Sequence, residues 1–105
     1  MDSSAYKIEY REAAEENLHK TYEHIAKTLK NPRAADQIQN AIFDALDYLI
    51  KDPEIYPLIG DSSYRKCIVE NYIAIYFVDH KKKTVYVDEV VCSLQNYLPK
   101  WRLPL

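Results

Sequence analysis

The chain has 105 residues, of which 48% are hydrophobic and 29% are charged, and its formal net charge is −2. This length suits one domain with one core, and this composition excludes a disordered chain. The mild net acidity also excludes a strongly cationic nucleic-acid binder.

The charge is divided unevenly along the chain. Residues 1–60 hold seven Lys/Arg and eleven Asp/Glu, whereas residues 61–105 hold seven and five. The two cysteines, Cys67 and Cys92, are too few for a disulfide framework or a zinc site, and we expect neither a metal nor another cofactor. The N-terminal residues do not resemble a signal peptide, and no apolar run is long enough to cross a bilayer. We therefore expect a cytoplasmic protein without membrane contact.

The first half of the chain predicts one strand and two helices. Residues 6–10 alternate between apolar and polar side chains, which is typical of a half-buried strand. From about residue 12 to residue 29 the apolar spacing predicts an amphipathic helix with a buried face of Ala14, Leu18, Tyr22, Ile25 and Leu29. Asn31 and Pro32 then supply an N-cap and a first-turn proline for a second helix, and we expect the two helices to form a hairpin on the sheet. The apolar stripe of this second helix consists of Ala35, Ile38, Ala41, Ile42, Ala45, Leu46 and Leu49.

The second half predicts an antiparallel meander of three strands. Runs rich in β-branched and aromatic residues cover 64–69, 72–78 and 84–92, and short polar breaks separate them. The continuous apolar run 72–78 is typical of a central strand buried on both faces. The predicted fold class is therefore α+β, in which the N-terminal strand and the meander form one sheet with the two-helix hairpin packed on one face. We expect a single domain over residues 1–105, with residues 93–105 as a C-terminal tail.

Two neighbouring basic residues in the first meander strand are candidates for contact with a partner. The side chains of Arg65 and Lys66 must point to opposite faces of the sheet. We expect Arg65 to lie on the face that the helices leave uncovered, where it would contact a phosphate group or a protein. The alternative for either side chain is an ordinary solvated charge.

Two other groups of side chains allow a functional and an ordinary interpretation. Glu15, His19 and Glu23 lie on one face of the first helix, but no further ligand accompanies them, which favours a solvated stripe over a metal site. In the tail, Tyr97 and Trp101 offer rings on which a base can stack. The alternative is that the tail packs against the protein itself.

Taken together and in their order along the chain, these segments resemble the RelE/ParE toxin superfamily of bacterial type II toxin–antitoxin systems. The similarity covers about residues 5–97. It includes the Tyr-x-Ile-x-Tyr strand, the Asn-Pro-x-Ala-Ala helix entry, the Asp-Pro-Glu helix exit, and the strands Tyr-Arg-Lys, Asn-Tyr-x-x-x-Tyr-x-Val-Asp and Lys-Thr-Val-Tyr-Val. The resemblance implies a toxin that a cognate antitoxin binds and neutralises, and it leaves room for a homodimer.

The superfamily contains two kinds of toxin, and the residues of this chain bear on the choice between them. RelE-like members cut messenger RNA on the ribosome, whereas ParE-like members inhibit DNA gyrase without known hydrolytic chemistry. RNA cleavage needs a base, an acid and cations at the scissile phosphate, which RelE-like nucleases supply mainly with basic side chains. Positions that are often basic in those nucleases are Cys67 and Ile73 here, and the segment with two arginines after the last strand is Ser93-Leu94-Gln95-Asn96-Tyr97. The resemblance therefore favours a ParE-like gyrase inhibitor.

Two alternatives stay open, and with them the question of enzymatic activity. One is a RelE-like, ribosome-dependent endoribonuclease, in which Arg65 would be the phosphate cation and Tyr97 and Lys100 further catalytic residues. The other is a degenerate module that only binds its antitoxin. The residues expected to contact a partner or nucleic acid are Lys66, Trp101 and Arg102.

Overall fold

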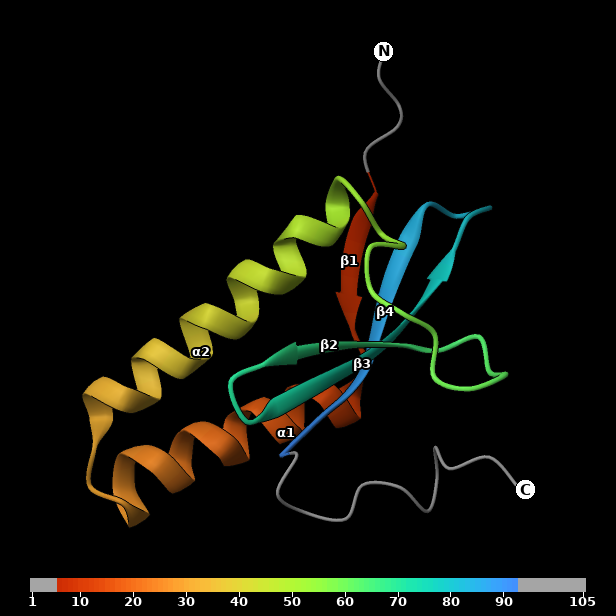
Figure 1. Ribbon diagram of the computed structural model, residues 1–105. Helices are drawn as coiled ribbons and strands as arrows, with labels where there is room; N and C mark the ends of the chain where they lie inside the picture. The colour runs from red at the N-terminus through yellow and green to blue at the C-terminus, as the bar shows by residue number, and fades with distance from the viewer. Residues whose placement is uncertain (1–5, 93–105) are drawn as a thin grey trace.

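The structure is a computed structural model that describes residues 6–92. Within this range four strands form one sheet, and two main helices pack on one of its faces (Figure 1). The elements in chain order are β1 (Lys7–Tyr10), α1 (Glu12–Glu23), the π-helical turn η1 (His24–Thr28), α2 (Pro32–Asp47), the 3₁₀ turn η2 (Tyr48–Ile50), β2 (Arg65–Val69), β3 (Tyr72–Asp79) and β4 (Thr84–Cys92). This order confirms the predicted α+β fold class.

The first helix departs from its prediction at the C-terminal end. Ala14, Leu18 and Ile25 are buried, as the apolar spacing predicts. At η1 the amide of Leu29 donates to the carbonyl of His24, five residues earlier. A π turn takes up more residues than an α turn, so the apolar stripe no longer faces the core beyond it. Leu29 is consequently 59% exposed, and its predicted place on the buried face is wrong.

The second helix begins and packs as predicted. Asn31 Oδ1 accepts a hydrogen bond from the amide of Ala34 at 3.1 Å, and Pro32 occupies the first turn. The fully buried residues of its apolar stripe, which continues into η2, are Ala35, Ile42, Leu46 and Leu49.

None of the helices in the described range is long and apolar enough to span a membrane.

The strand order in the sheet is β1-β4-β3-β2. β2, β3 and β4 pair antiparallel, as the meander predicts, while β1 pairs with β4 in parallel, so the sheet is mixed. β3 has a strand on each side, and four consecutive residues from Ile73 to Tyr76 are buried. The prediction of a central strand buried on both faces is therefore confirmed.

The two faces of the sheet carry clusters of different size. The main core lies under the helices, where Cys67, Tyr76 and Val87 pack with side chains of α1 and α2. On the opposite face a smaller cluster consists of Ile73 and Ile75 with Ile59, Tyr64 and Val91. Ile59 and Tyr64 come from the segment before β2, which therefore covers part of the second face.

Candidate functional site

Arg65 lies on the helix-covered side of the sheet, not on the open side that we expect from the sequence. It is paired with Tyr76 across β2 and β3, and residues directly opposite each other present their side chains on the same face. Tyr76 belongs to the main core. The expectation for Arg65 is therefore wrong. The alternation along one strand separates Arg65 from Lys66, but only the register against β3 decides which of them faces the helices.

The guanidinium group of Arg65 holds the loop that precedes β2. Nη1 donates to the carbonyl of Tyr56 at 2.8 Å and to that of Glu54 at 3.4 Å. Nη2 lies 3.6 Å from Glu54 Oε2, and the Arg65 side chain is only 18% exposed. The positive charge of Arg65 is thus engaged by groups of the protein itself.

Further hydrogen bonds join this loop to the start of β1. His80 Nε2 lies 2.8 Å from Glu54 Oε2, and His80 Nδ1 lies 2.7 Å from the hydroxyl of Tyr6. The Tyr76 hydroxyl donates to the carbonyl of Pro53 at 3.0 Å, and burial raises the pKa of Tyr76, which keeps this donor protonated. The N-terminal strand, the loop before β2 and the turn after β3 are therefore tied together at one end of the sheet.

Lys66 lies on the opposite, more open face. It is paired with Ile75 of the smaller cluster. On the same face the rings of Phe77 and Tyr86 stack with their centroids 5.1 Å apart. The guanidinium carbon of Arg11 lies 5.3 and 4.8 Å from the two ring centroids. This face therefore presents cationic and aromatic groups together.

Two positions at which the resemblance to RelE-like nucleases places basic residues are buried here. Cys67 is 0% exposed and Ile73 is 4% exposed. Burial raises the pKa of the Cys67 thiol, although a hydrogen bond with Tyr56 opposes part of this effect. The thiol therefore stays protonated, and neither position offers a cation or a nucleophile at the surface.

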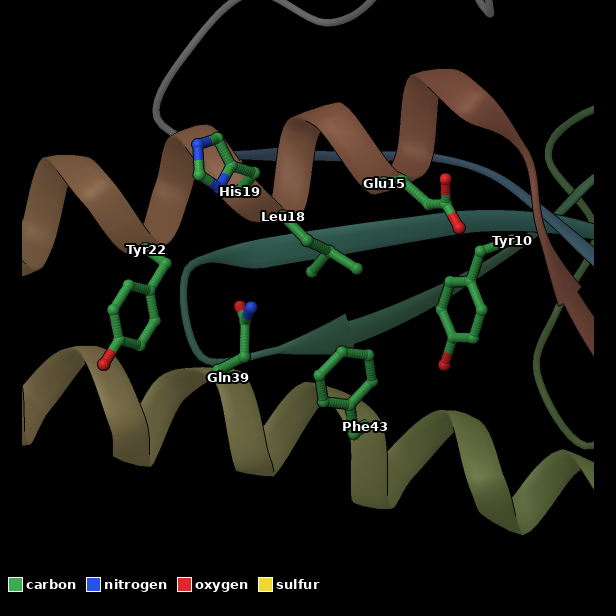
Figure 2. A pocket seen from close by; sticks show the side chains of 7 residues that line it. All are labelled: Tyr10, Glu15, Leu18, His19, Tyr22, Gln39 and Phe43. Carbon is green, nitrogen blue, oxygen red and sulfur yellow. The ribbon is translucent and has the colours of Figure 1, made fainter.

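A groove with a volume of about 430 Å³ lies between α1 and α2 (Figure 2). At one end the rings of Tyr10 and Phe43 meet edge to face, with centroids 5.8 Å apart. At the other end the Tyr22 hydroxyl donates to Asp36 Oδ1 at 2.6 Å. Burial, with a smaller effect of the Asp47 charge, raises the pKa of Tyr10 to about 12, so its hydroxyl is neutral. The lining residues are Tyr10, Glu15, Leu18, His19, Tyr22, Gln39 and Phe43.

The sequence does not predict this groove, because its lining comes from three elements whose packing is not local. It identifies Glu15 and His19 only as part of a solvated stripe on the first helix. Glu23, the third member of that stripe, pairs with Lys27 at 2.9 Å. No group of three potential metal ligands occurs among residues 6–92. The one sequence feature that could have indicated the groove is that aromatic and polar side chains flank the apolar stripe on both helices.

Four of the predicted site residues lie outside the described range, namely Tyr97, Lys100, Trp101 and Arg102. Their roles stay predictions. The structure places the other two, Arg65 and Lys66, on opposite faces of the sheet.

The arrangement of the elements matches solved toxins of one superfamily. The chromosomal ParDE system from P. aeruginosa superimposes with a TM-score of 0.72 at 16% identity, over 86% of this chain and 98% of that one. The RelBE2 toxin–antitoxin complex from Mycobacterium tuberculosis gives a TM-score of 0.61 at 18% identity, over 84% and 98%. A mutant of the E. coli toxin RelE in the free state gives 0.62 at 20% identity, over 85% and 84%. The fold is therefore that of the RelE/ParE toxins.

The sequence defines the family within this class. A family model described as the ParE toxin of the type II toxin–antitoxin system parDE matches residues 8–97. The chain belongs to this family, and it is a type II toxin. A search of curated proteins found no match. The predicted resemblance to the RelE/ParE superfamily, closer to its ParE-like members, is confirmed.

Proposed function

We propose that this toxin inhibits DNA gyrase by binding it, without a catalytic step, and that a cognate antitoxin neutralises it. The observation that carries the proposal is the burial of Cys67 and Ile73, where an RNA-cleaving relative would need exposed basic side chains. RNA cleavage requires cations at the scissile phosphate, whereas inhibition by binding requires only a complementary surface. The match to the ParE family supports the same target.

The contacts of Arg65 also support inhibition by binding. Its guanidinium donates to the carbonyl of Tyr56 and lies beside the carboxylate of Glu54. To contact a phosphate group it would have to leave these partners, and a hydrogen bond to a charged group contributes about 1.5–3 kcal/mol. Arg65, which matches a basic position of the nuclease pattern, would therefore be available to a phosphate group only at a cost to the stability of the fold.

The more open face of the sheet is the surface that we assign to the target. Lys66 lies there, and Arg11 stacks on Phe77 and Tyr86. Arginine and aromatic side chains are enriched among the residues that contribute most to protein–protein affinity. In this proposal Trp101 and Arg102 also contact the target, as the sequence predicts.

An antitoxin is the second partner in the proposal. Solved structures with this fold include a ParDE system and RelBE toxin–antitoxin complexes. A reading frame next to the toxin gene is the place to look for its antitoxin. Light scattering of the free toxin and of the complex would give the stoichiometry and would detect a homodimer.

The test is a gyrase supercoiling assay with purified toxin, run beside primer extension on messenger RNA from cells that express it. We expect loss of supercoiling, recovery on addition of the antitoxin, and no new RNA ends. Lys66→Glu should weaken the inhibition because it reverses a charge on the assigned surface. Lys82→Glu is the matched control, since Lys82 is an exposed residue of the turn between β3 and β4.

Two other results would overturn the proposal in different ways. RNA cleavage with intact supercoiling would establish a RelE-like endoribonuclease. Arg65, Tyr97 and Lys100 would then be its catalytic candidates, and Arg65→Ala should abolish cleavage. Antitoxin binding without growth arrest or gyrase inhibition would establish a degenerate binding module.

A further inference from the structure

Acidic side chains surround the groove between α1 and α2. Its lining contains Glu15 but no lysine or arginine. Asp36 adjoins it through the hydroxyl of Tyr22, and the charge of Asp47 acts on Tyr10. Over the whole hairpin, residues 12–47 hold seven Asp/Glu against four Lys/Arg. A cationic group is therefore favoured electrostatically in this groove.

The groove also contains a hydrogen-bond acceptor that the described part of the chain does not use. Gln39 Oε1 is buried and accepts no hydrogen bond within residues 6–92. The Gln39 side chain extends from α2 into the space between the helices, opposite Leu18 of α1 (Figure 2). Leaving a buried polar atom unpaired destabilises a protein, and native structures contain few such atoms. A ligand that donates a hydrogen bond at this point would remove that cost.

The aromatic end of the groove adds a requirement on the shape of the ligand. Tyr10 and Phe43 form an edge-to-face pair there. A guanidinium group is planar, stacks on aromatic rings and carries five N–H donors. A lysine ammonium is a compact, strongly hydrated charge that lacks the planar face. The volume of about 430 Å³ is sufficient for a complete arginine side chain.

We propose that this groove binds an arginine side chain that the antitoxin presents. The guanidinium donates to Gln39 Oε1, pairs with the carboxylate of Glu15 and rests against the rings of Phe43 and Tyr10. This contact deepens the proposed function and rests on it, because it names the surface and the chemistry by which the antitoxin engages the toxin. The groove lies on the helical side of the molecule, away from the sheet face assigned to gyrase.

Titration of nitrogen-15-labelled toxin with N-acetyl-arginine methylamide tests the groove without the antitoxin. We expect saturable shifts of the Gln39 side-chain amide and the Glu15 backbone amide, with a dissociation constant on the order of 1–10 mM. N-acetyl-norleucine methylamide is the matched probe, because it keeps an apolar stem and lacks the charge and the donors. It should leave both signals in place.

Two toxin variants remove the two polar contacts separately. Glu15→Gln and Gln39→Leu should each weaken arginine binding about fivefold or more. Glu16→Gln is the charge-matched control, because Glu16 pairs with Lys20 at 3.4 Å and does not line the groove. Gln37→Leu is the control for α2. Gln39→Leu should also make the free toxin more stable, since it removes the unpaired atom.

Calorimetric titration with the antitoxin then separates this inference from the proposed function. We expect Glu15→Gln and Gln39→Leu to weaken the complex and the two controls to bind as wild type does. Replacing one antitoxin arginine should abolish the difference between wild-type toxin and these variants. Full affinity in both variants, or no saturable shift with the arginine probe, would overturn the inference and leave gyrase inhibition standing. Arginine binding by a toxin that affects neither gyrase nor growth would overturn the proposed function instead.

Discussion

On the helix-covered face of the sheet Cys67, Tyr76 and Val87 are fully buried, whereas on the opposite face Ile68 is 59% exposed. The first face packs against two helices, and within residues 6–92 the second is covered only in part, by Ile59 and Tyr64 from the segment before β2. The same alternation of side chains along each strand therefore serves two purposes. One side supplies most of the burial that stabilises the fold, and the other leaves cations and rings available for contact.

The largest effect should come from the core under the helices. Leu46→Ala should lower the free energy of unfolding by about 3 kcal/mol, because it removes a fully buried side chain and leaves a cavity. Ile68→Ala, at the exposed position on the other face, should change it by less than about 0.5 kcal/mol. Urea denaturation followed by circular dichroism measures both. Equal losses would show that the two faces do not differ in the way the burial indicates.

The neighbours Arg65 and Lys66 give the next largest contrast. Arg65→Met should cost about 2 kcal/mol, since it removes the hydrogen bonds from the guanidinium to the loop carbonyls. Lys66→Met, on the open face, should stay within about 0.5 kcal/mol of wild type. Limited proteolysis should cut residues 51–64 faster in the Arg65 variant. Arg65→Lys should not restore stability, because a lysine cannot reproduce the two-pronged geometry.

An Arg65→Met toxin with wild-type stability and an uncut loop would contradict the structural role of Arg65. The guanidinium would then be free for a phosphate or a partner. That result would also revive the endoribonuclease alternative, in which Arg65 is the cation at the scissile phosphate.

The contrast between the faces also shows which features the sequence can predict. The strands and helices follow from periodicity and capping, which are local, so Asn31 and the central strand 72–78 are as expected. The face of Arg65 depends on pairing with β3, and a single strand carries no information on it. The prediction that Leu29 is buried is wrong because the π turn rotates the following residues of the helix away from the core. The groove at Gln39 arises only where two helices and β1 meet, which no motif in one segment encodes.

The smallest effect concerns the stack of Arg11 on Phe77 and Tyr86. Arg11→Ala should lower the free energy of unfolding by about 0.5–1 kcal/mol, as expected for an exposed cation over aromatic rings. Lys7→Ala, which removes an exposed cation of β1, is the control and should have no measurable effect. Denaturation and the supercoiling assay on the same samples separate a role of this stack in stability from a role in gyrase binding. A fall in gyrase inhibition larger than the loss of folded protein would mean that Arg11 and the rings contact the target. Unchanged inhibition with reduced stability would mean that the stack serves the fold alone, and the target surface would then have to be sought around Lys66.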